Sequence, residues 1–258
     1  MNLIEVNDLH VRYGDFEAVK GVSFSLGKGE ILGIVGESGS GKSTVARTLI
    51  GLQKAASGTI AIASKHPTAQ TPRHQAVSLQ MIFQDAVGSL NPRMTVEQTL
   101  REVIAHQPAN PNTQTPQHPN TQTPESLLSL VGLSTAVLDQ YPRELSGGQC
   151  QRVSIARALA TNPEVLIADE PVSALDVSVQ ARILNILRDL RTQLGLSILL
   201  IAHDLAVVKN VCDRICVMEK GLFVDEGPAA EVFASPKSDY TKRLLSAVPD
   251  VARSLSLR

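Results

Sequence analysis

A glycine-rich segment near the N-terminus has the residue types and spacing of a phosphate-binding loop. GESGSGKST, residues 36–44, fits the pattern G-x-x-x-x-G-K-[ST] and lies between the apolar run ILGIV and a segment of helical periodicity. Its glycines let the backbone wrap closely around phosphates, while loop N–H groups and the helix start supply positive potential. We expect Lys42 to reach the β- and γ-phosphates of a nucleotide and Ser43 to ligate Mg²⁺. A turn that matches by chance is the alternative, and the strand–loop–helix context argues against it.

Two adjacent acids follow a second apolar run. VLIADEP, residues 165–171, ends a predicted buried strand with Asp169 and Glu170. A nucleoside triphosphatase needs an acid near its metal ion and a group that positions or activates water. Asp169 is expected to hold the water shell of the metal, and Glu170 to orient and deprotonate the attacking water. Alone, the pair could be a solvated turn, but the phosphate loop favours the catalytic interpretation.

Two single polar residues follow other predicted core strands. Gln84 comes after LQMIF and His203 after LSILLIA. In parallel sheets, side chains at such strand ends converge on the ligand. Neither residue is convincing alone, because a lone histidine at a strand end is more often structural. The five other histidines, at positions 10, 66, 74, 106 and 118, keep that structural interpretation.

A second glycine-rich turn, LSGGQCQR at residues 145–152, opens another helix. Ser146, Gly147 and Gly148 predict a capped helix start that could bind an anion. The turn lacks the lysine and hydroxyl of a complete phosphate site. It is therefore half of a site and requires another half.

The elements that must position these residues alternate along the chain. The pattern of residues 3–35 predicts strands, followed by a helix over 43–51. The apolar run at 165–169 is followed by a helix expected over 178–194, and the run at 196–202 by a helix expected over 204–212. Strands that alternate with helices predict an α/β fold with a mainly parallel sheet flanked by helices. Residues 86–160 predict a helical stretch interrupted by a proline-rich insert at 107–124, which repeats PNTQTP. We interpret the insert as a disordered surface loop; a tethering or recognition role is the alternative.

The composition excludes several classes of protein. The chain has 258 residues, 43% of them hydrophobic, and a formal net charge of −1, so it has no global basic field for nucleic acid. The N-terminus lacks the pattern of a signal peptide, and no apolar run approaches the ~20 residues that a membrane span needs. We expect a cytosolic chain whose membrane role depends on partners. Its three cysteines are widely separated, which favours buried thiols over a metal or redox site.

In their order along the chain, these motifs resemble the ATP-binding subunit of an ATP-binding cassette (ABC) transporter, over roughly residues 3–250. The resemblance implies a P-loop NTPase core with an N-terminal antiparallel β subdomain and a helical subdomain inserted in the core. It makes Tyr13 the adenine-stacking aromatic, although a core tyrosine is the alternative. It adds 145–149 as the family signature and SALD, 173–176, as the D-loop. The implied nucleotide contacts are Tyr13, Gly36, Glu37, Ser38, Gly39, Ser40, Gly41, Lys42, Ser43, Thr44, Ser146, Gly147, Gly148 and Gln149.

The resemblance also implies the roles of the remaining site residues. Gln84, Glu170 and His203 are expected to be catalytic, and Ser43, Gln84 and Asp169 to hold Mg²⁺. Two cassettes of this family pair head to tail, so the signature of each contacts the nucleotide on the phosphate loop of the other. The implied partners are a second ATPase subunit, identical or related, two transmembrane permease subunits, one of which contacts the surface around Gln84 to Met94, and indirectly a solute-binding protein. The implied location is peripheral, at the cytoplasmic face of the cell membrane.

Three further segments indicate the branch of the family. FQDAVGSLNPRMTVEQTL, DVSVQARILNIL and DYTKRLLSAVPD are similar to the importers of peptides and nickel. The chain stops at Arg258, before the C-terminal extension usual there, and Cys150 replaces a residue that is commonly basic or amide. A soluble ABC ATPase of a metabolic complex, such as one for phosphonate degradation, is therefore the alternative. A non-catalytic cassette is disfavoured by intact Lys42, Asp169, Glu170 and His203.

The expected organisation is one ABC ATPase domain over 1–258. Its core covers about 1–85 and 161–235, and its helical subdomain about 86–160. A short tail, 236–258, follows the core.

Overall fold

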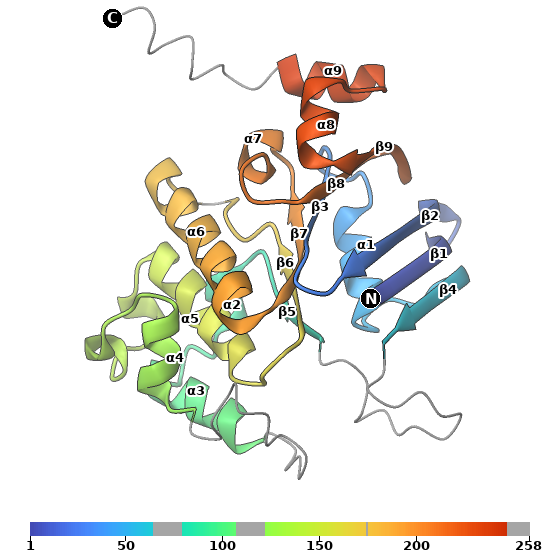
Figure 1. Ribbon diagram of the computed structural model, residues 1–258. Helices are drawn as coiled ribbons and strands as arrows, with labels where there is room; N and C mark the ends of the chain where they lie inside the picture. The colour runs from blue at the N-terminus through green and yellow to red at the C-terminus, as the bar shows by residue number, and fades with distance from the viewer. Residues whose placement is uncertain (64–78, 107–121, 174, 247–258) are drawn as a thin grey trace, which may run out of the picture. The chain divides into compact units, whose positions relative to one another are not determined.

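The computed structural model describes residues 1–63, 79–106, 122–173 and 175–246 (Figure 1). The strands, in chain order, are β1 (Asn2–Tyr13), β2 (Phe16–Gly27), β3 (Ile31–Val35), β4 (Ser57–Ile62), β5 (Leu79–Ile82), β6 (Val165–Asp169), β7 (Ser197–Ala202), β8 (Arg214–Glu219) and β9 (Leu222–Pro228). They form a three-stranded sheet of order β2-β1-β4 and a six-stranded sheet of order β5-β6-β7-β3-β8-β9.

The α-helices, in chain order, are α1 (Lys42–Leu49), α2 (Ala86–Ser89), α3 (Val96–Ala105), α4 (Pro124–Leu130), α5 (Gly147–Leu159), α6 (Val177–Leu194), α7 (Leu205–Val208), α8 (Ala229–Ala234) and α9 (Asp239–Ser246). Two short 3₁₀ helices, η2 (Thr135–Val137) and η3 (Pro142–Glu144), lie between α4 and α5.

The chain divides into two compact units. The first, called unit 1 here, consists of Met1–Glu5, Ser25–Glu30 and Ala61–Leu199. The second, called unit 2, consists of Val6–Phe24, Ile31–Ile60 and Leu200–Arg258.

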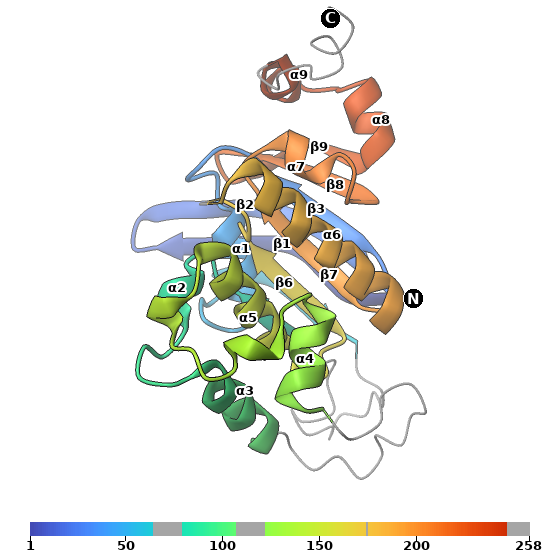
Figure 2. The same ribbon diagram turned by 90° about the vertical axis from the view of Figure 1, so that its left-hand side faces the viewer.

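Within unit 1, two parallel strands carry a helical layer. β5 pairs with β6, so that Leu79 lies opposite Val165 and Ile82 opposite Ala168. All five residues of β6 are buried, as expected for a strand in the interior of a parallel sheet. Helices α2, α3 and α4 each pack against α5, and α6 also contacts α5 (Figure 2). The helix that follows the LSGG turn is therefore the centre of this helical layer.

Within unit 2, the five buried residues of β3 pair in parallel with β8. β8 then turns back into β9 through Lys220 and Gly221, both at positive φ, and the two strands run antiparallel. Helices α8 and α9 pack against β9 in the C-terminal part of the chain (Figure 1). The phosphate loop starts where β3 ends.

The predicted fold class is confirmed. β1 and β2 are neighbours in the small sheet and are joined by a two-residue turn, Gly14-Asp15, so they run antiparallel. The larger sheet is mixed, because antiparallel β9 continues its parallel strands. The domain bounds expected from the sequence stay predictions.

Two expected segments differ from the structure or lie outside it. The helix expected over 204–212 is only four residues long, Leu205–Val208, because the chain turns after it to start β8 at Arg214. Most of the insert expected to be disordered, residues 107–121, lies outside the described residues. Its last residues start α4, where Thr123 caps the helix and Pro124 occupies the first turn, a position that suits proline.

The three cysteines are buried, as expected for thiols that pack in the core. Burial raises the pKa of the Cys150 thiol, whose Sγ contacts the carbonyl of Pro142 at 3.4 Å. Burial also raises the pKa of Cys212 strongly. Neither thiol is thus a thiolate near neutral pH.

Within the described ranges, no group of three or more His, Cys, Asp or Glu side chains is arranged to hold a metal ion. Across the same ranges, no helix has the length and apolar character needed to cross a bilayer.

The β1–β2 hairpin carries a charged cluster around a histidine. His10 Nδ1 lies 2.8 Å from Glu17 Oε1, and His10 Nε2 lies 3.3 Å from Asp8 Oδ1. The Glu17 contact is the main reason that the pKa of His10 is raised from 6.5, and the same contact lowers the pKa of Glu17. The folded hairpin therefore favours a protonated imidazole beside an ionised carboxylate.

This cluster predicts how stability depends on pH. Because the folded pKa of His10 is raised, its contribution to the free energy of unfolding is fully present below pH 6.5 and is lost as pH rises through the raised value. The difference in urea midpoint between wild type and His10→Gln should therefore be larger at pH 6 than at pH 9. His106→Gln, at a ring that contacts the backbone carbonyl of Glu102, is the matched control. An equal difference at both pH values would contradict the role of the cluster.

Candidate nucleotide-binding and hydrolysis site

The phosphate loop in unit 2 spans residues 36–41, between β3 and α1, and it approaches other backbone closely. A Cβ atom on Gly36 would lie 2.1 Å from the carbonyl oxygen of Met218 on β8. At Gly41, where φ is +112°, a Cβ would lie 2.6 Å from the carbonyl oxygen of Ala18. A side chain fits at neither position, so the glycines predicted from the pattern are required by close packing of the loop.

Lys42 is held inside this loop. Its side chain is only 3% exposed, and Nζ donates to the carbonyl oxygens of Gly36 at 2.7 Å and Glu37 at 2.8 Å. A buried ammonium group is costly unless it is hydrogen-bonded, and these carbonyls fix its position. Residues 37–39 at the rim of the loop are exposed. The buried Ser40 Oγ has no hydrogen-bond partner among the described residues. The rim of the loop is exposed, Gly36 and Gly41 pack closely against other backbone, and the lysine is oriented. This arrangement fits a phosphate group.

The other predicted site residues of unit 2, both the nucleotide contacts and the catalytic histidine, lie at the start of a helix or at the end of a strand. Ser43 and Thr44 are half-buried in the first turn of α1. Tyr13 ends β1 with 45% of its surface exposed, so its ring is not a core side chain. His203 is exposed directly after β7. The exposure of Tyr13 leaves its ring accessible for stacking on a base.

Within unit 1, the structure brings the predicted glutamine and glutamate together. Gln84 Nε2 donates to Glu170 Oε2 at 3.1 Å, and it lies 3.5 Å from Ser173 Oγ. Ser173 Oγ in turn donates to the carbonyl oxygen of Glu170 at 3.2 Å. Glu170 has a φ of +46°, a conformation that non-glycine residues rarely adopt and that is frequent at functional sites. Gln84 thus contacts the carboxylate of Glu170, and Ser173 contacts the backbone of the same residue.

Asp169, the last residue of buried β6, is 2% exposed. A carboxylate, the hydroxyl of Ser43 and the amide oxygen of Gln84 are all hard oxygen donors of the type that Mg²⁺ prefers. Their chemistry fits the predicted magnesium ion.

The signature turn forms a helix cap in which side chains and backbone hydrogen-bond to each other. Ser146 Oγ accepts from the backbone N–H of Gln149 at 3.3 Å, and Gln149 Oε1 accepts from the backbone N–H of Ser146 at 2.8 Å. This reciprocal pair is a capping box at the start of α5. Ser146 and Gly147 remain exposed, whereas a Cβ on Gly148 would lie 2.5 Å from Val179 Cγ1 on α6. The helix start predicted from the sequence is therefore present and faces solvent.

The predicted D-loop is fixed from α6. Gln180 Nε2 donates to the carbonyl oxygens of Val172 at 3.1 Å and Leu175 at 2.9 Å. These two bonds bracket the turn that follows Glu170. Gln180 thus contacts the backbone on both sides of residue 174, which lies outside the described residues.

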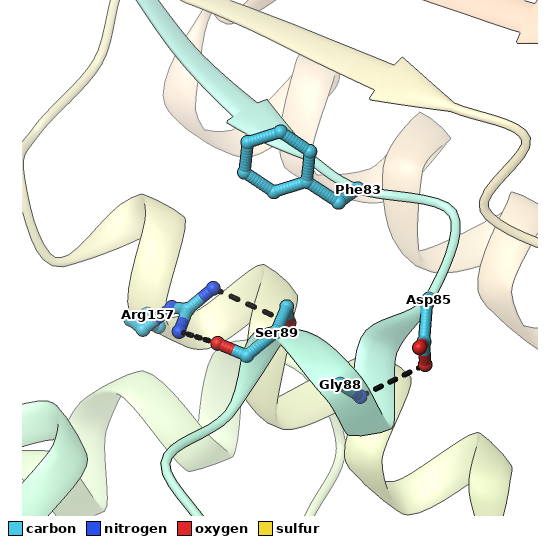
Figure 3. A pocket seen from close by; sticks show the side chains of 5 residues that line it. All are labelled: Phe83, Asp85, Gly88, Ser89 and Arg157. Atoms are coloured by element: carbon cyan, nitrogen blue, oxygen red, sulfur yellow. Dashed lines mark hydrogen bonds between the residues drawn. The ribbon is translucent and has the colours of Figure 1, made fainter.

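A hollow of about 310 Å³ lies beside Gln84, lined by Phe83, Asp85, Gly88, Ser89 and Arg157 (Figure 3). Arg157 on α5 donates to the carbonyl oxygen of Ser89 at 2.6 Å and lies 3.4 Å from Ser89 Oγ. Asp85 Oδ1 caps α2 by accepting from the backbone N–H of Gly88 at 2.8 Å. The signature helix α5 is therefore bonded directly to the segment that follows Gln84.

Sequence reasoning missed Ser173 and Arg157 as members of the site. Ser173 stands within the D-loop, but nothing in the sequence shows that its hydroxyl meets Gln84. Arg157 stands in the otherwise apolar run SIARALA, and a charged residue there signals a specific partner.

Comparison with known proteins decides the family. Residues 19–173 match the model of the family described as ABC transporter. The chain is 45% identical over 238 residues, 91% of this chain and 73% of the relative, to the oligopeptide transport ATP-binding protein OppF of Lactococcus lactis subsp. lactis strain IL1403. It is 44% identical to OppF of Escherichia coli strain K12, over 96% of this chain and 78% of the relative. This chain belongs to the ABC transporter family.

Solved structures agree with this assignment. CbiO1 of Clostridium perfringens, part of the ABC transporter complex cbiONQ, superposes with a TM-score of 0.75 and 26% identity over 99% of each chain. The ATP-binding cassette MJ0796, solved as a dimer bound to ADP and Pi, superposes with a TM-score of 0.70 and 27% identity, over 88% of this chain and 98% of that chain. The chain is thus an ABC ATPase of the peptide importer branch, and its ATP hydrolysis is coupled to transport.

The close approach at Gly36 of this ABC ATPase predicts a stability effect. Gly36→Ala should lower the free energy of unfolding by about 1–3 kcal/mol, because the new methyl group overlaps the Met218 carbonyl and backbone must shift. Thermal unfolding without nucleotide measures this change.

Gly147→Ala is the matched control, because a Cβ there meets only Leu175 Cδ2, at an ordinary 3.5 Å. Its unfolding temperature should stay near that of wild type. Equal stability of the two variants would show that the loop does not depend on the close approach.

Proposed function

We propose that this chain is the ATP-binding, ATP-hydrolysing subunit of an importer that takes up oligopeptides through separate transmembrane subunits. The observation that carries the substrate class is the identity of 44–45% to OppF proteins of two organisms, over more than nine-tenths of this chain. Their names favour oligopeptides over nickel, the other substrate of the branch. They also favour a transporter over a soluble metabolic complex.

Nucleotide binding begins at the phosphate loop in this proposal. The N–H groups of residues 36–44 and the start of α1 hold the phosphates, and Lys42 transfers its hydrogen bonds from the loop carbonyls to the β- and γ-phosphate oxygens. Tyr13 stacks on the adenine ring. The burial of Lys42 supports this role, because an ammonium kept in place by two carbonyls loses little freedom on meeting a ligand.

Hydrolysis depends on the strand-end residues. Ser43, Asp169 and Gln84 would hold Mg²⁺, which would neutralise charge on the phosphates. Glu170 orients the attacking water and accepts its proton while the bond from the γ-phosphorus to ADP breaks. His203 stabilises charge on the γ-phosphate. The bond from Gln84 to Glu170 supports this assignment, since it connects a metal ligand with the base.

The signature serves a second subunit in this proposal. Ser146, Gly147, Gly148 and Gln149 contact the γ-phosphate of a nucleotide on the facing cassette, whether that cassette is identical or related. The capped start of α5 supports the role, because Ser146 and Gly147 are exposed at the positive end of the helix. The γ-phosphate therefore favours the paired state, and its loss after hydrolysis separates the pair.

The hollow after Gln84 receives a cytoplasmic helix of a transmembrane subunit. Phe83 lines the hollow and is 37% exposed, and Val87 on α2 is 50% exposed. The Arg157–Ser89 bonds connect this surface to the signature helix. Binding at this surface would place the chain at the cytoplasmic face of the membrane as a peripheral subunit, with the solute-binding protein on the other side.

The catalytic assignment predicts the behaviour of Glu170→Gln. The variant should bind ATP like wild type but lose steady-state hydrolysis by at least about 100-fold, because it lacks the general base. It should also accumulate as an ATP-bound dimer in size-exclusion chromatography. Hydrolysis near the wild-type rate would show that Glu170 is not the base.

A second substitution tests where the signature acts. Ser146→Arg, added to Glu170→Gln, should abolish the dimer and leave ATP binding by the monomer intact. Loss of ATP binding by the monomer would mean that Ser146 serves the nucleotide of its own chain.

Deletion of the gene tests the transport assignment. The strain should lose uptake of a radiolabelled tripeptide and regain it with the wild-type chain but not with Glu170→Gln. Tagged wild-type chain should co-purify with two apolar proteins from detergent-solubilised membranes. Unchanged peptide uptake, with the chain recovered in a complex without membrane proteins, would favour the metabolic alternative.

A further inference from the structure

The C-terminal helix α9 reaches the phosphate loop through one tyrosine. The hydroxyl of Tyr240, on a side chain only 6% exposed, accepts a hydrogen bond of 2.9 Å from the backbone N–H of Glu37. Both residues belong to unit 2, although they are 203 positions apart in the sequence. Tyr240 thus contacts the loop from the side of the C-terminal tail.

The N–H that Tyr240 binds shares a peptide unit with the carbonyl that binds Lys42. That carbonyl belongs to Gly36 and accepts from Lys42 Nζ at 2.7 Å. A trans peptide is planar and its N–H and C=O point in opposite directions, so a partner on one group orients the other. Tyr240 and Lys42 therefore hold opposite edges of the same peptide plane.

The segment that carries Tyr240 is itself anchored to β9. Asp225 Oδ2 accepts from the backbone N–H groups of Lys237 at 2.7 Å and Ser238 at 3.3 Å. Ser238 Oγ then accepts from the backbone N–H of Thr241 at 3.0 Å in the first turn of α9. These hydrogen bonds fix the start of α9 and therefore the position from which the Tyr240 hydroxyl reaches the loop.

The charge state of the phenol suits this contact. Burial raises the pKa of Tyr240, so the hydroxyl stays neutral at physiological pH. The guanidinium of Arg243 lies 5.9 Å from the centre of the ring and 3.9 Å from Glu219 on β8. Arg243 thus lies near both the ring and β8.

We propose that Tyr240 is a positioning residue for nucleotide binding: its hydroxyl fixes the Gly36–Glu37 peptide and so holds Lys42 ready for the phosphates. The proposal rests on the phosphate-binding role of Lys42 given above. Tyr240 acts through the peptide and does not touch the nucleotide. The C-terminal tail is then part of the machinery that prepares the phosphate loop.

The test is Tyr240→Phe in the full chain, which removes the hydroxyl and keeps the ring. Without nucleotide, hydrogen–deuterium exchange at the Glu37 amide should accelerate by about three- to tenfold, because its acceptor is gone. Exchange over α9 should stay at the wild-type rate. The Kd for ATP, measured by displacement of a fluorescent ATP analogue, should rise by about three- to tenfold.

Tyr141→Phe is the matched control, because it makes the same chemical change in unit 1. It should leave both the exchange of the loop and the Kd unchanged. Wild-type exchange and wild-type Kd in Tyr240→Phe would overturn the proposal. Faster exchange across α9 as well as the loop would also overturn it, since Tyr240 would then be only an anchor for the helix.

Lys42→Ala separates this inference from the proposed function. If ATP binding is lost in Lys42→Ala but unchanged in Tyr240→Phe, only the inference about Tyr240 fails. If ATP binding is insensitive to Lys42→Ala, the role of Lys42 fails, and the exchange rate of the Glu37 amide still reports whether Tyr240 orders the loop.

Discussion

The phosphate loop depends on a backbone-to-backbone contact that leaves no room for a side chain. Gly36 packs against the carbonyl of Met218, and the backbone N–H of Gly221 donates to the carbonyl oxygen of Ser40 at 2.9 Å. The loop is therefore fixed to the end of β8 and to the turn that follows it. Because α1 begins directly after the loop, the direction of the helix and the position of Lys42 both follow from this contact.

In unit 1, strand ends and helix caps position polar groups in a different way. β6 is buried over its whole length and releases Glu170 at a positive φ, where Gln84 and Ser173 meet it. Arg157 bonds the signature helix to the segment after Gln84. The proposed catalytic carboxylate is thus bonded to Gln84, and the segment after Gln84 is bonded to the signature helix, which gives a physical basis for coupling between them.

Much of the fold was predictable from the sequence, because the apolar pattern along the chain coincides with the burial of its residues. The apolar runs at 31–35, 165–169 and 197–202 are buried strands, and α6 ends at Leu194, where the helix expected over 178–194 also ends. The β8–β9 hairpin was missed, although Lys220-Gly221 between apolar alternations is a turn signal. The contact of Tyr240 with Glu37 could not be predicted, because it joins distant segments through folding, and no local spacing reports such a bond.

The capping box at Ser146 has a consequence for how two subunits meet. Its side chain and that of Gln149 satisfy each other's backbone, so this recognition surface is already ordered in a single chain. Ordering a flexible segment at the moment of association consumes conformational entropy and weakens binding. A subunit whose signature is already rigid has lost that entropy during its own folding, before it meets a partner. In the proposed pairing, association then requires no further ordering of the signature.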